Sequence, residues 1–161
     1  MMKNAIERTY YSGPAIDGIT DADTRDFLER NGLPTHHLLF DADPAAPAGV
    51  SPHGNSAVSL GEVSGGRLCV DQRTGEAYVA GTHGGTWYAN RTVRQFALSL
   101  AKFDEMNPFY GPGDEDEVLE AAVQQLVAAL TTIDPSALSA PGTHWQDLVA
   151  DVINGDYIAE E

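Results

Sequence analysis

Histidine is the residue type in this sequence best suited to bind a metal or transfer a proton, and its spacing argues against both roles. His36 and His37 are adjacent, so in a strand their rings would point to opposite faces and could not share one ion. The sequence has no HExxH and no CxxC pattern, the usual spacings of zinc ligands. We therefore expect structural or solvated histidines, no bound metal and no cofactor. The five histidines are His36, His37, His53, His83 and His144.

Three further patterns have a chemical and a structural interpretation, and we favour the structural one for each. Asp41 and Asp43 resemble the start of a calcium loop, but a proline follows and the bidentate glutamate at the twelfth position is missing. The segment GTHGGT, residues 81–86, lacks the Walker spacing and its lysine, which indicates a hairpin turn. Cys69, the only cysteine, lies in an apolar run with no activating base, which predicts a buried small side chain.

Nucleophilic catalysis has no recognisable pattern in the sequence. No GxSxG elbow is present, and scattered Ser, His and Asp residues are expected by chance in a chain of this length. Paired carboxylates that hydrolyse glycosides depend on spatial separation, which a sequence does not show. A small hydrolase therefore stays open as a third function, behind two kinds of binding protein.

The charge is strongly uneven along the chain. The formal net charge is −15, of which residues 1–102 contribute −2 and residues 103–161 contribute −13, with 13 acidic residues and no Lys or Arg. Such a field repels phosphate backbones, so we expect no direct binding of nucleic acid. It attracts a basic protein instead. Acidity that serves only solubility, or adaptation to salt, is the other explanation.

The densest acidic cluster lies before a predicted helix. Carboxylates at a helix N-terminus offset the macrodipole, so the cluster is explained locally as a solvated helix start. A surface that contacts a partner protein is the alternative, and the candidate contact residues are then Asp114, Glu115, Asp116, Glu117 and Glu120.

Length and composition predict one ordinary folded domain. The chain has 161 residues, of which 42% are hydrophobic, so we expect a single domain over 1–161, with 1–19 as a loosely ordered N-terminal segment. No signal peptide and no apolar run of 18 residues is recognisable, which argues against secretion and membrane spanning. A lone cysteine fits a reducing cytoplasm. The oligomeric state stays open.

Hydrophobic patterning gives the elements of the first third. We predict a short helix after Thr20, which could cap it, and an end at Gly32 and Pro34. Residues 36–40, HHLLF, are expected to form a short strand, and the Pro/Ala-rich residues 41–55 an exposed loop.

The rest of the chain changes from strands to helices. Four strands joined by turns are predicted at 57–63, 67–71, 76–80 and 86–90. Three helices are expected from capping residues and apolar spacing, beginning at the pairs Thr92/Gln95, Asp114/Glu117 and Thr143/Gln146. The order predicts an α+β fold with an antiparallel central sheet of about four to six strands and helices packed against it.

Several segments together resemble the SUKH superfamily of bacterial immunity proteins, in particular its fourth, actinobacterial-type subfamily. The resemblance spans roughly residues 20–157, and Asn90 followed by the Phe96, Leu100, Phe103 helix is its most specific part. The matching segments are FLERNGLP (27–34), the expected turn LGEV (60–63), RLCVDQRTGEAYV (67–79), WYANRTVRQFALSLAKFD (87–104), IDPSAL (133–138) and HWQDLVADVINGD (144–156).

The resemblance implies a non-enzymatic protein that binds and neutralises a cognate toxin of a polymorphic toxin system, typically a nuclease or a nucleic-acid deaminase. A scaffold or regulator that binds an endogenous protein is the alternative. We expect a framework role for five residues: Gly61 and Gly75 in turns, Trp87 and Phe96 in the core, and Asn90 at the corner between strand and helix.

Overall fold

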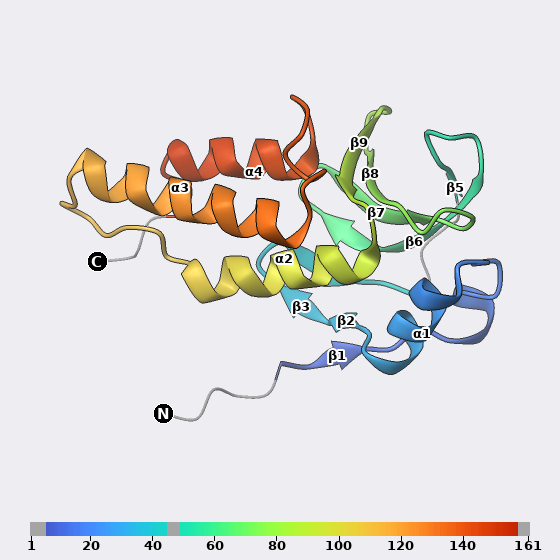
Figure 1. The fold of residues 1–161 in the computed structure, drawn as a ribbon. Helices are drawn as coiled ribbons and strands as arrows, with labels where there is room; N and C mark the ends of the chain where they lie inside the picture. The colour runs from blue at the N-terminus through green and yellow to red at the C-terminus, as the bar shows by residue number, and fades with distance from the viewer. Residues whose placement is uncertain (1–5, 45–48, 158–161) are drawn as a thin grey trace. The chain divides into compact units, whose positions relative to one another are not determined.

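The computed structural model describes residues 6–44 and 49–157, and the chain divides into two compact units. Unit 1 comprises Met1–Trp87 with Thr92–Arg94, and unit 2 comprises Tyr88–Arg91 with Gln95–Glu161. The elements of both are labelled in Figure 1. The four helices and the mostly antiparallel sheet confirm the α+β class. A single domain over 1–161 stays a prediction.

Unit 1 is built around the sheet. Its strand order is β3-β4-β6-β7-β8-β9, and β5 pairs with β6, so the sheet has seven strands where four to six were expected. Every pairing from β3 to β8 is antiparallel. The strands are β3 His36–His37, β4 Phe40–Ala42, β5 Gly49–Val50, β6 Ser56–Val63, β7 Gly66–Asp71, β8 Ala77–Gly81 and β9 Thr86–Asn90; a separate two-stranded sheet pairs β1 Arg8–Thr9 with β2 Leu33–Pro34.

Two predictions for the first third of the chain are wrong in detail. HHLLF is not one strand but a hairpin, because His37 Nδ1 accepts the Leu39 amide at 2.9 Å and closes a turn in which Leu38 is exposed. Within the expected loop 41–55, the structure continues β4 to Ala42 and pairs β5 with β6; residues 45–48 lie outside the described part. In these short strands, backbone pairing with distant segments determines the structure, and the local sequence pattern alone was too weak to predict it.

The N-terminal segment is folded where it is described, contrary to the expected loose order. The side chains of Tyr11, Ile16 and Ile19 are each about 1% exposed, and a short 3₁₀ helix, η1, spans Gly13–Ala15. The Tyr11 hydroxyl donates to the Leu60 carbonyl of β6 at 2.5 Å. Periodicity missed this segment because its buried residues occur singly between turns.

Helix α1, Ala22–Arg30, lies in unit 1 beside the turn between β7 and β8. Its N-cap is Asp21, whose carboxylate accepts the Thr24 amide at 3.1 Å, so the predicted cap Thr20 is wrong. Thr20 instead donates through its amide and hydroxyl to the Gln72 carbonyl. The predicted end is confirmed, because Gly32 has φ of +63° and its amide bonds to the Phe27 carbonyl.

Gly61 lies inside β6 at a register shift and not in the expected turn 60–63. A Cβ atom there would lie 2.2 Å from the Asp41 carbonyl oxygen and 2.7 Å from the Phe40 ring. We therefore expect Gly61→Ala to lower the free energy of unfolding by about 2 kcal/mol, because β4 would have to move. Gly49→Ala in β5 is the control, since nothing lies within 4 Å of its Cβ position. Urea unfolding of both variants measures the difference, and equal stabilities would contradict the assigned contact.

Unit 2 contains most of the helical residues. The helices are α2 Val93–Met106, which begins in unit 1, α3 Asp116–Ile133 and α4 His144–Ile153. The pattern-based expectation for α4 is confirmed, because Thr143 Oγ1 accepts the Gln146 amide and Trp145, Leu148, Val149 and Val152 are buried. Helices α3 and α4 lie alongside each other and run in opposite directions (Figure 1).

Candidate functional site

The predicted acidic contact residues lie together at the exposed start of α3. Asp114, Glu115, Asp116, Glu117 and Glu120 are all exposed. The helix begins at Asp116 with Glu115 as its N-cap, one residue later than the predicted cap Asp114, because the Asp114 carboxylate accepts the Gly111 amide and caps the preceding turn instead. Among the described residues no ion pair involves any of the five. The start of α3 is therefore an uncompensated anionic surface.

A hollow of about 370 Å³ adjoins this surface between the start of α3 and the end of α4. Two rows of side chains spaced four residues apart run along α3, one polar and one apolar. The polar row, Asp116, Glu120 and Gln124, forms one margin of the hollow. The apolar row, Leu119 and Val123, continues along the helix to Val127, which is 37% exposed. Ile153, which is 52% exposed, comes from α4. The lining residues are Asp116, Leu119, Glu120, Val123, Gln124 and Ile153.

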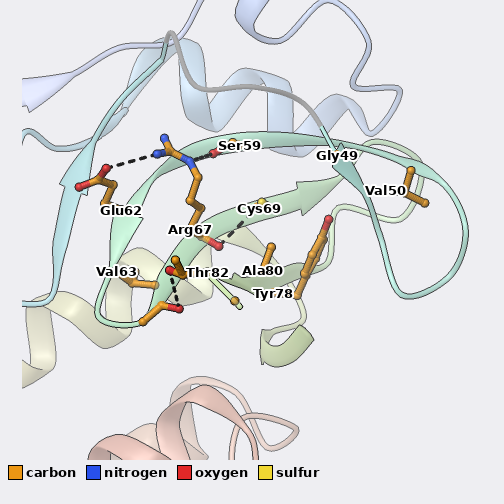
Figure 2. A pocket seen from close by; sticks show the side chains of 13 residues that line it. Gly49, Val50, Ser59, Glu62, Val63, Arg67, Cys69, Tyr78, Ala80 and Thr82 are labelled. Carbon is orange, nitrogen blue, oxygen red and sulfur yellow. Dashed lines mark hydrogen bonds and ion pairs between the residues drawn. The ribbon is translucent and has the colours of Figure 1, made fainter. Parts of the chain in front are cut away.

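A second hollow, of about 570 Å³, lies in unit 1 over β6, β7 and β8 (Figure 2). The Arg67 guanidinium crosses it and donates to Ser59 Oγ at 2.7 Å. Glu62 and Asp43 pair with the same guanidinium at 3.4 and 3.1 Å. Two carboxylates thus offset the positive charge of Arg67, which leaves little attraction for an anionic ligand.

The nucleophiles of this second hollow are poorly suited to catalysis. Burial raises the pKa of the Cys69 thiol, against smaller opposite effects from Ser59, Tyr78 and Arg67, and Cys69 is only 4% exposed. Burial likewise raises the pKa of the Tyr78 hydroxyl above its usual range, and nearby Cys69 and Asp71 add to this. Both groups are therefore protonated at neutral pH, and a thiol in that state is a weak nucleophile.

Two of the histidines contact nearby carboxylates. His36 Nδ1 lies 3.1 Å from the Asp41 carboxylate, and His53 Nε2 lies 3.0 Å from Glu76. In the part of the chain that the structure describes, no three metal-ligating side chains come together. His144 differs from the others, because its Nε2 is buried and has no hydrogen-bond partner among the described residues.

Burial of His144 predicts a pH-dependent stability. Desolvation lowers the pKa of the imidazole to about 4, so the folded protein keeps it neutral while the unfolded chain binds a proton below about pH 6.5. We therefore expect the free energy of unfolding to fall as pH decreases from 6.5 to 4, by up to about 3 kcal/mol. His144→Asn should lose this part of the slope. Urea unfolding at pH 7, 5.5 and 4.5 tests it, and parallel profiles for the two proteins would contradict it.

Three of the five expected framework residues lie in unit 1. Gly75 occupies the turn after β7 with φ of +78°, a conformation that favours glycine. Trp87 is not in the core as expected: it is 36% exposed, because its ring lies against Gly81 at the surface of the hairpin. Gly61, described above, belongs to a strand.

The other two framework residues are buried in unit 2: Asn90 belongs to a polar network, and Phe96 packs against it. Asn90 is fully buried; its Oδ1 accepts from Trp145 Nε1 at 2.7 Å, and its Nδ2 donates to Asp134 at 3.1 Å. Asp134 also accepts the Arg91 amide at 2.9 Å. Phe96 is buried, and its ring centroid lies 5.9 Å from that of Trp145.

Two buried aspartates were missed by the sequence analysis. Burial opposes their ionisation, but hydrogen bonds outweigh it: Ser51 and three other donors lower the pKa of Asp71 to about 2, and Ser136, Arg91 and Asn90 lower that of Asp134. Each is satisfied by its own fold, so neither is available to a ligand. The Asp-x-x-Thr-Gly turn signal after β7 was the one indication available for Asp71.

The structure is thus that of an acidic α+β protein with an exposed, negatively charged helix start. The sequence profile of the SUKH-4 immunity protein family matches residues 14–151. The chain therefore belongs to the SUKH-4 immunity protein family, which indicates a toxin-neutralising immunity function. The searches of curated proteins and of solved structures returned no match. No described helix is both long and apolar enough to cross a membrane.

Proposed function

We propose that this protein neutralises a cognate toxin with a basic surface, a nuclease or a nucleic-acid deaminase, by direct contact in the cytoplasm. The observation that carries the proposal is the uncompensated acidic start of α3 in a chain of the SUKH-4 immunity family. Enzymes that act on nucleic acid carry Lys and Arg for the phosphate backbone. An acidic inhibitor complements that surface and increases the rate of encounter.

Binding, and not catalysis, is the proposed mode of action. In the hollow of unit 1 the arginine is paired with carboxylates and the thiol and phenol are protonated, so no activated nucleophile or general base is provided there. A protein that inhibits by binding over its target needs only a rigid fold and a complementary surface.

A titration of toxin activity tests this mode. The probe is the toxin domain encoded by the gene beside this one, assayed for nuclease or deaminase activity while the protein is added. We expect inhibition to be complete at one protein per toxin, because each inhibitor molecule occupies one active site. A cationic nuclease from an unrelated source is the control for unspecific charge attraction and should stay active. Complete inhibition at a small fraction of one equivalent would indicate catalysis and contradict the proposal.

A further inference from the structure

The groove between α3 and α4 exposes apolar side chains where a helix without a partner would have polar ones. Leu119 and Val123 line it from one row of α3, and Val127 continues that row toward solvent. Ile153 on α4 is 52% exposed at the same groove. Continuous apolar surface of this kind on a soluble domain is typical of an interaction site.

One margin of the groove is anionic. Asp116 and Glu120 are separated by one helical turn, so both carboxylates lie along the same side, followed by Gln124. The ion pair between Lys102 and Glu105 on α2 involves neither residue of this margin. The two carboxylates of this margin therefore form a negative surface that a cation would complement.

We infer that this groove binds an amphipathic helix of the toxin; the inference rests on the proposed function and specifies its contact. Apolar residues of the incoming helix, spaced by three and four, insert between Leu119, Val123 and Ile153. Lysine or arginine residues on the flank of that helix pair with Asp116 and Glu120. A groove formed by two helix surfaces offers side-chain ridges and no strand edge, which favours a helix over an extended peptide.

Charge selects this occupant over two others. A second copy of this chain would bring its own formal charge of −15 to an already negative surface, which opposes self-association. A nucleic acid would be repelled for the same reason. A cationic, amphipathic protein segment can contact both the apolar side chains of the groove and its anionic margin.

Hydrogen exchange on the unaltered complex is the first test. The full chain is mixed with the toxin domain encoded by the neighbouring gene, and amide exchange is followed by mass spectrometry. We expect protection of residues 116–124 and of the residues around Ile153, because the bound helix excludes water there. Protection confined to the sheet of unit 1 would overturn the inference.

Two double variants test the two parts of the groove. Val123→Ala with Ile153→Ala truncates two of the three apolar side chains that line the groove and keeps helix-forming residues. We expect affinity to fall at least about tenfold, chiefly through faster dissociation. Asp116→Asn with Glu120→Gln removes the anionic margin, and we expect about threefold to tenfold slower association and a weaker dependence on salt. Leu98→Ala on α2, 50% exposed, and Asp23→Asn with Asp26→Asn on α1 are the matched controls.

The outcomes separate this inference from the proposed function. Weaker binding by both groove variants, with unchanged controls and unchanged thermal unfolding, supports the groove. If the wild type binds the toxin and the groove variants bind it equally well, the groove inference is wrong and the proposed function stands. Failure of the wild type to bind or inhibit the toxin overturns the proposed function and, with it, the groove inference.

Discussion

Replacing Asp114, Glu115 and Asp116 by lysine is expected to slow association with the toxin by about 10-fold to 100-fold at low ionic strength. The three side chains are exposed and carry no described ion pair, so their charge acts on an approaching protein without internal compensation. Dissociation should change less than association. Stopped-flow association rates at several salt concentrations measure the effect, and the slope of the rate against ionic strength should flatten in the variant.

A control with the same change in net charge separates the position of the charges from their sum. Asp23, Asp26 and Glu29 are exposed on α1, in the other compact unit, and their replacement by lysine alters the net charge equally. We expect this variant to associate clearly faster than the α3 variant. Equal rates for the two would show that total charge alone governs encounter, and the start of α3 would lose its assigned role.

Asn90→Ala is expected to cause a large loss of stability, because Asn90 is fully buried and hydrogen-bonded on both sides. It leaves the Trp145 indole N–H without its acceptor at 2.7 Å and removes a donor from the buried Asp134 carboxylate. Each unsatisfied buried group costs about 1–3 kcal/mol, so the total loss should be about 3 kcal/mol or more. For a chain of this length that lowers the melting temperature by roughly 6–12 °C. Thermal unfolding and urea unfolding both measure it.

A double-mutant cycle assigns the loss to the network. Trp145→Phe removes the indole donor together with part of the ring. Asn90→Ala combined with Trp145→Phe should therefore cost less than the sum of the two single variants, by about 1 kcal/mol, because the shared hydrogen bond is lost only once. Asn154→Ala is the matched control, because Asn154 is exposed at the end of α4. If the two single losses of stability add exactly, or if Asn90→Ala costs less than Asn154→Ala, these hydrogen bonds do not stabilise the junction between β9 and α2.

Elements with strong local signals were predictable from the sequence, and long-range pairings were not. The four strands from Ser56 to Asn90 and helix α4 follow from alternation, turn residues and capping. The short strands β1 to β5 have two or three residues each, and their formation depends on partners distant in sequence. Alternation over so few residues carries too little information to predict them.

The same distinction applies to the candidate site. The acidic residues of α3 were found from composition, because an uneven charge distribution is visible without coordinates. The groove was not, since Ile153 and Val123 are 30 residues apart and meet only when α4 runs back along α3. The prediction for Trp87 was wrong because a large aromatic residue in a strand usually points into the core. Here Gly81 has no side chain, so the Trp87 ring packs against its backbone at the surface.

Helix α3 is anchored unequally along its length. Of its 18 residues only Leu126 and Leu130 are buried, and both lie in the second half. Substitutions of the exposed residues in the first half are therefore expected to change the stability little. A partner-contacting surface at these positions could therefore change in sequence while the fold stays intact.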